Sequence, residues 1–106
     1  MKTIDKSQLL SAIAGKEREV EIPGIGNIKI KSLEFSEVKE IQDKAKDDMM
    51  LTALYIVRYG LVEPALTDED IVTLYKGQPG KISKISAEIS KVSGMVDEEN
   101  FTGTTS

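Results

Sequence analysis

The chain has 106 residues, 40% hydrophobic and 30% charged, which predicts a single globular domain. It contains no cysteine and no histidine. This excludes disulfides, thiolate nucleophiles and cysteine-based zinc sites, and it removes the usual general base near neutral pH. The net charge of −4 disfavours binding to a phosphate backbone. The longest apolar-rich stretch, 49–62, is shorter than the roughly 20 residues of a membrane span, and no signal peptide is expected at the start.

The first predicted element is a short helix over residues 7–14. Its apolar face is formed by Leu9, Leu10 and Ile13. Gly15 is expected to end this helix in a left-handed conformation.

Between about residues 18 and 31 the apolar pattern changes to a period of two, interrupted by turn residues at 23–27. This pattern predicts a two-stranded antiparallel hairpin. The expected register satisfies an apolar face and a charged face at once, pairing Ile22 with Ile28, Val20 with Ile30, Glu21 with Lys29 and Glu19 with Lys31. Because an isolated hairpin is marginally stable in water, helices must cover its apolar face.

Four further helices are predicted after the hairpin. They span about 35–46, 48–60, a short segment capped by Thr67 that ends at Gly77, and 79–93 with Gly94 as its cap. The fold class is therefore α+β and mostly α: one small domain over 1–94 with a hairpin and four to five helices. The acidic and polar tail, 95–106, is expected to be disordered.

Two motifs resemble ligand sites without their usual context. Gly24-Ile25-Gly26 is followed by a predicted strand, whereas a phosphate-binding loop leads into a helix. Two acidic groups, Asp43/Asp47/Asp48 and Asp68/Glu69/Asp70, lack the ligand periodicity of a calcium loop and suit helix ends. We therefore expect no catalytic residue, no cofactor and no metal, and a protein that is not an enzyme.

The segment 49–57 is apolar around most of its circumference when it is drawn as a helix. Such a helix is either central to the core or partly covered by a partner, and both alternatives stay open. Adjacent methionines are adaptable contacts, and tyrosines are enriched at binding hot spots.

The predicted last helix carries a series of lysines: Lys76, Lys81, Lys84 and Lys91, on or near it. A basic helix is one way to contact nucleic acid, so a small nucleic-acid-binding regulator is the alternative function. The helix has no arginine and no aromatic residue, and the molecule is acidic overall. A solvated polar face is therefore favoured over a nucleic-acid interface.

The order of elements carries a resemblance to a known family. An Ile-Pro-Gly-Ile-Gly-Asn-Ile-Lys-Ile-Lys ribbon precedes a helix opened by residues 32–38. An apolar helix then ends in Val-Glu-Pro, Thr-Asp-Glu-Asp follows at 67–70, and the last helix ends in Ser-Gly. In this order residues 17–94 resemble the tail assembly chaperone family of long-tailed bacteriophages and prophages, in its short, non-frameshifted form.

The resemblance implies a protein made in the host bacterial cytoplasm and absent from the mature virion. Such a chaperone binds the long tape measure protein, keeps it soluble and helps recruit tail tube protein, the latter through a longer frameshifted form in many phages. The family has no catalytic residues to transfer, and self-association stays open. The residues expected to contact the partner are Met49, Met50, Tyr55, Tyr59, Ile82, Ile85 and Ile89.

Overall fold

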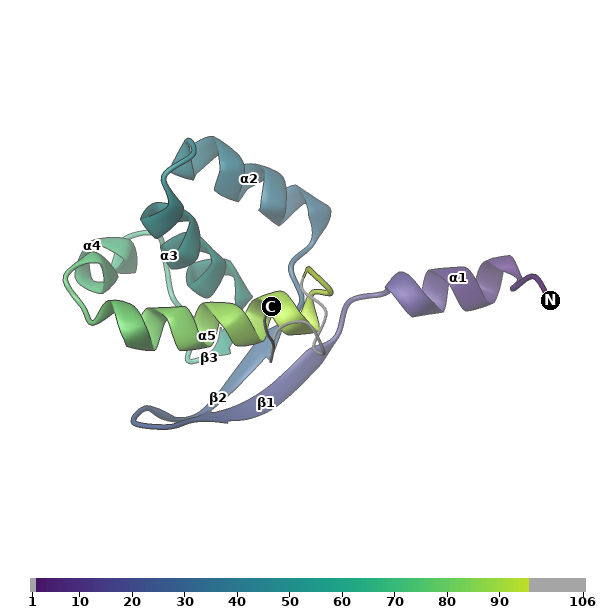
Figure 1. Cartoon of the computed structure of the whole chain (residues 1–106), viewed down its shortest axis with the longest axis horizontal. Coiled ribbons are helices and arrows are strands. Elements are labelled where there is room, and N and C mark those ends of the chain that lie inside the picture. The colour runs from purple at the N-terminus through teal and green to yellow at the C-terminus, as the bar shows by residue number, and fades with distance from the viewer. Residues whose placement is uncertain (1, 96–106) are drawn as a thin grey trace, which may run out of the picture.

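The computed structural model describes residues 2–95, and within them it contains five helices and a three-stranded antiparallel sheet (Figure 1). The elements are α1 (Lys6–Ile13), β1 (Glu17–Ile22), β2 (Gly26–Lys31), α2 (Phe35–Ala45), α3 (Met49–Gly60), β3 (Leu61–Glu63), α4 (Asp70–Tyr75) and α5 (Pro79–Val92). The predicted α+β class is confirmed. The third strand, β3, was not predicted. The tail that was predicted to be disordered begins at Met95, and the rest of it lies outside the described residues.

The hairpin forms, but its predicted register is wrong by two positions. Val20 pairs with Ile28 instead of Ile30, and Ile22 pairs with Gly26 instead of Ile28. A shift of two keeps every side chain on its predicted face. The opposed charges are retained with new partners, which are Glu19 with Lys29 and Glu17 with Lys31.

The turn between the strands explains this register. The Ile25 N–H donates to the Ile22 carbonyl oxygen at 2.9 Å, so the chain reverses within four residues. Pro23 occupies the second position of this turn, and Gly24 the third, with a φ of +83° that favours glycine. The predicted pairing of Ile22 with Ile28 required a loop of residues 23–27. The observed pairing of Ile22 with Gly26 leaves a loop that is two residues shorter.

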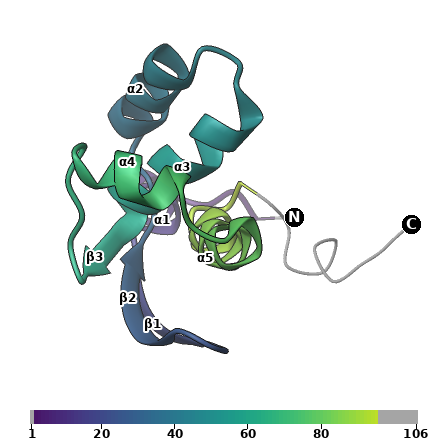
Figure 2. The ribbon, with the colours of Figure 1, turned by 90° about the vertical axis from the view of Figure 1, so that its left-hand side faces the viewer.

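The core lies between the sheet and the helices. β2 is the central strand, and α5 packs along α3 and over β1 and β2 (Figures 1 and 2). The three most deeply buried large side chains come from three of these elements: Ile30, Val57 and Ile89. α3 and α5 approach closely at Gly60, where an added Cβ would lie 2.5 Å from Ile89 Cγ2. A glycine is therefore required for this helix contact.

The helix ends agree only partly with the sequence analysis. Gly94 has a φ of +73°, its N–H donates to the Lys91 carbonyl, and the Met95 N–H donates to the Ser90 carbonyl, so the predicted glycine cap is confirmed. The predicted cap at Gly15 is wrong, because α1 ends at Ile13 and Ala14 is already extended.

The predicted N-cap at Thr67 is also wrong. α4 begins at Asp70, and the Thr67 N–H and hydroxyl both donate to the Asp70 carboxylate. Thr67 thus closes a turn before the helix.

α1 lies apart from the rest of the described chain and contributes no buried residue (Figure 1). The other four helices lie together: α5 packs against β1 and β2, and α3 contacts α2, α4, α5 and β3. None of the helices among residues 2–95 combines the length and the apolar character that a membrane crossing requires.

Candidate partner-binding surface

The start of α3 presents two methionines to solvent. Asp48 caps the helix, its Oδ1 accepting hydrogen bonds from the Met50 N–H at 2.9 Å and the Leu51 N–H at 3.1 Å. This cap fixes the first turn of the helix. Met49 is 85% exposed and Met50 is 59% exposed. Two large apolar side chains are therefore held on a helical turn that is already ordered.

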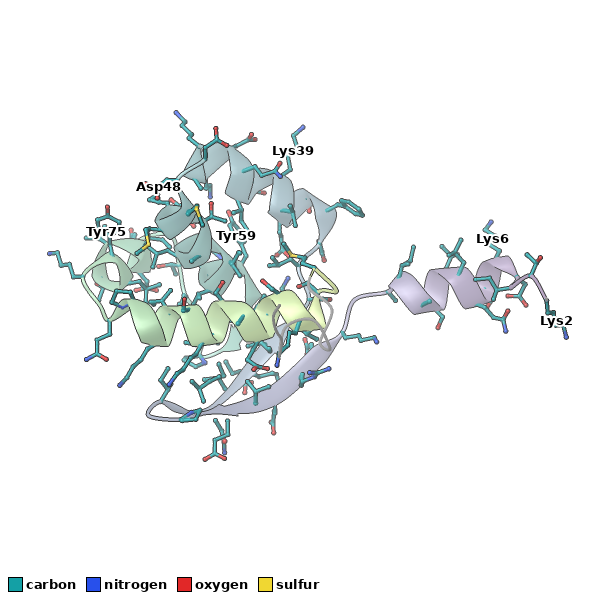
Figure 3. The ribbon with its side chains drawn as sticks, viewed as in Figure 1. Lys2, Lys6, Lys39, Asp48, Tyr59 and Tyr75 are labelled. Carbon is teal, nitrogen blue, oxygen red and sulfur yellow. The ribbon has the colours of Figure 1, made fainter. Side chains whose placement is uncertain are left out.

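A small hollow of about 200 Å³ lies beside Met50, between α3, α4 and α5. Its lining is mostly apolar and comprises Met50, Ala53, Leu54, Leu74, Tyr75, Gly77, Pro79, Ile82 and Ser83. Val72 and Tyr75 are both exposed and stand three residues apart on α4, so they face the same side of that helix. We name Met49, Met50, Val72, Tyr75 and the hollow the methionine surface. Asp48 and Tyr75 mark its position in Figure 3.

The size and lining of the hollow indicate the kind of ligand it suits. Small-molecule sites usually enclose about 300–1,000 Å³, which is more than this hollow provides. Its volume suits the insertion of a single apolar side chain, with the exposed methionines and Tyr75 contacting the residues around it. This is the arrangement by which a groove receives one face of an amphipathic helix.

The other end of α3 carries a polar network with α2 and the loop before α4. Lys44 Nζ donates to Tyr59 Oη at 2.6 Å and contacts Asp68 Oδ2 at 2.9 Å. Arg58 Nε donates to Asp68 Oδ1 at 2.7 Å, and the Tyr59 hydroxyl donates to Glu40 Oε1 at 2.7 Å. We name these five residues the Lys44 network. It joins three segments that are distant in the sequence.

The ionisation of the network follows from these contacts. The hydrogen bonds from Lys44 and Arg58 lower the pKa of Asp68 below its ordinary value, more than partial burial raises it. The hydrogen bonds with Tyr59 and Asp68 raise the pKa of Lys44. Partial burial is the main cause that raises the pKa of Tyr59. The network therefore favours a charged Lys44 and Asp68 beside a neutral Tyr59.

The structure distributes the predicted contact residues over three environments. Met49, Met50 and Ile82 come together at or beside the hollow. Tyr55 and Tyr59 are half-buried on the Lys44 side of α3, where Lys44 Nζ lies 5.6 and 5.2 Å from their ring centroids. Ile85 and Ile89 lie buried in the core, where Ile89 packs against Gly60 of α3. The methionine surface therefore includes only part of the predicted set.

Sequence reasoning missed the contribution of α4. Within α4 only Ile71 is buried, Leu74 is partly buried, and Val72 and Tyr75 are exposed. The spacing of Val72 and Tyr75 was a usable signal, because residues three apart share a helix face. Asp68 was also missed, since an acid ahead of a helix was interpreted as a first-turn residue.

The remaining motifs take part in local structure. Gly24 lies in the hairpin turn, and its carbonyl accepts a hydrogen bond from Lys81 Nζ at 3.3 Å. Lys91 pairs with Glu88 at 3.1 Å. Two of the four lysines of the alternative nucleic-acid surface are thus engaged within the chain. Within residues 2–95, no three acidic side chains converge in a group that could hold a metal ion.

Comparison with models of known protein families, with curated proteins and with solved structures finds no match to this chain. The candidate site therefore stands on the geometry of the methionine surface and on the sequence pattern.

Proposed function

We propose that the chain is an assembly chaperone that binds the tape measure protein of a long-tailed bacteriophage or prophage and helps recruit tail tube protein. It acts in the host cytoplasm and is left out of the finished virion. The observation that carries the proposal is the methionine surface, an apolar area on capped helix α3 with a hollow suited to one side chain. The resemblance of residues 17–94 to tail assembly chaperones supplies the identity of the partner.

The chemistry of the partner fits this surface. A tape measure protein is a very long, largely helical chain that exposes apolar side chains before the tail assembles around it. Exposed methionines adapt to differing apolar partners, so one surface can cover several helical segments. The hollow is small, which favours a transient interface that releases its partner when the tail tube is added.

Co-expression tests this function. The tape measure protein encoded downstream is produced alone, with the chain, and with the Met49→Lys/Met50→Lys double variant, and its soluble fraction is measured. We expect the chain to raise the soluble fraction and the double variant to raise it much less, because two buried charges oppose docking. Met95→Lys is the matched control, since Met95 is 50% exposed but lies at the other end of α5. An unchanged soluble fraction with the wild-type chain rejects the proposal.

A further inference from the structure

A second apolar area lies far from the methionine surface, on α1. The helix is well formed at its start: Asp5 and Gln8 make a reciprocal capping box, with bonds of 2.8 and 3.0 Å. Leu9, Leu10 and Ile13 are nevertheless all exposed, and α1 buries no residue. A helix of eight residues is marginal in water unless its apolar face is covered. α1 is therefore a formed helix, and no other element among residues 2–95 buries its apolar face.

The end of α1 borders a large open hollow of about 890 Å³. Ala12 and Ile13 form one wall, and the opposite walls come from the start of α2 and the end of α5. The apolar lining on those walls comprises Leu33, Phe35, Val38, Val92 and Met95. Phe35 is 95% exposed, although an aromatic ring gains much from burial. One end of the uncovered apolar face of α1, at Ile13, and the uncovered apolar residues around Phe35 thus border one hollow.

The link between α1 and the sheet is short and contains one flexible position. The Lys16 N–H donates to Ser32 Oγ and the Ser32 N–H donates to the Lys16 carbonyl, both at 2.8 Å, so Lys16 is fixed to the sheet. Only Ala14 and Gly15 lie between this clamp and the helix, and glycine accepts a wide range of backbone angles. α1 is about 12 Å long, and its linker is fixed to Ser32, three residues before Phe35, so Phe35 lies within the reach of a helix that rotates at Gly15. The same link is too short to bring α1 to the methionine surface, at the other end of α5.

We propose that α1 is a strap that folds over the hollow of its own chain and packs Leu9, Leu10 and Ile13 against Phe35. The closed strap covers both exposed apolar surfaces by a change at one or two linker residues. Any partner segment that uses Phe35 must displace α1 first. This inference is independent of the proposed chaperone function, because the hollow shares no residue with the methionine surface.

The chain contains no tryptophan, so Phe35→Trp places a single fluorescent reporter in the hollow. Acrylamide quenching of this tryptophan is measured in the otherwise intact chain and in the Leu9→Ser/Ile13→Ser background. A strap that is closed half of the time lowers quenching about twofold relative to that background. Ile25→Ser is the matched control, since Ile25 is an exposed apolar residue in the hairpin turn and its loss leaves quenching unchanged. Circular dichroism verifies that each variant is folded.

Three results would each contradict the proposal that α1 closes over Phe35. The first is a tryptophan as accessible in the intact chain as in the serine background. The second is protection that survives the loss of Leu9 and Ile13. The third is protection that disappears on hundredfold dilution, because a concentration-dependent cover comes from a second copy of the chain and not from α1 of the same molecule.

Discussion

The two ends of α3 are built from similar apolar sequence and yet have opposite environments. At the end of the helix, Val57 is almost fully buried, Gly60 touches Ile89, and Tyr59 belongs to the Lys44 network. At the start, Met49 and Met50 are exposed beside a hollow. The closed end fixes the helix to α2, α5 and the loop before α4. The open end is therefore held in place by the closed end, and it is the end that we propose for binding.

The largest effect on stability is expected at the closed end. Gly60→Ala places a Cβ 2.5 Å from Ile89 Cγ2, so α3 and α5 must move apart. Overpacking of this kind costs about 1–3 kcal/mol, measured as the free energy of unfolding in urea. Gly80→Ala in α5 is the control, because an added Cβ there has no neighbour within 4 Å and alanine favours the helix. Equal effects of the two substitutions contradict the close contact.

A smaller effect is expected from the Lys44 network. Asp68→Asn removes the carboxylate that binds Lys44 and Arg58, and these groups are partly exposed, so the loss is about 0.5–1 kcal/mol. Glu69→Gln removes a neighbouring charge that forms no ion pair among residues 2–95 and leaves thermal stability nearly unchanged. If Glu69→Gln lowers the melting temperature as much as Asp68→Asn does, the network does not hold α3.

The pH dependence sharpens this second prediction. The pKa of Asp68 is lower in the folded chain than its ordinary value of 3.8, because the ionised carboxylate binds Lys44 and Arg58. Its contribution is therefore complete above about pH 5, where the carboxyl is ionised in the unfolded chain too, and it is lost as the pH falls through the folded pKa. The difference in unfolding free energy between wild type and Asp68→Asn should shrink below pH 4. A difference that grows on acidification contradicts the assignment.

The smallest effect on stability is expected at the open end. Met50→Ala removes a side chain that is 59% exposed, so the free energy of unfolding should change by no more than about 0.5 kcal/mol. Chemical denaturation of wild type and variant measures this difference. A loss of 2 kcal/mol or more, in the range of buried methionines, shows that the methionine surface is part of the core.

The sequence predicted the elements better than their contacts. Alternation in 19–22 and 28–31 was enough for the hairpin and its faces, because those depend on a period of two. The register depends on the backbone angles of Gly24, which the alternation does not determine. β3 was missed because three residues directly after a helix show no period, and pairing with β2 is what makes them a strand.

The candidate site was predicted in part for a similar reason. The apolar character of 49–57 located the helix but could not identify its exposed side, since that depends on how α2, α4 and α5 pack around it. Asp48 was recognised as a start of a helix, and this is the residue that orients Met49 and Met50. Ile85 and Ile89 share a stripe with Ile82, and the spacing of the stripe does not show that Ile82 is only partly buried while the other two are buried.

The central claim is that the open end of α3 binds an apolar helical partner. Its most direct test is the dissociation constant of the purified chain for the tape measure protein, measured for wild type, Met50→Lys and Met95→Lys. We predict that Met50→Lys weakens binding about tenfold or more, which is about 1.4 kcal/mol, while Met95→Lys binds like wild type. Equal affinities for Met50→Lys and wild type, or no binding by the wild-type chain, would contradict the claim.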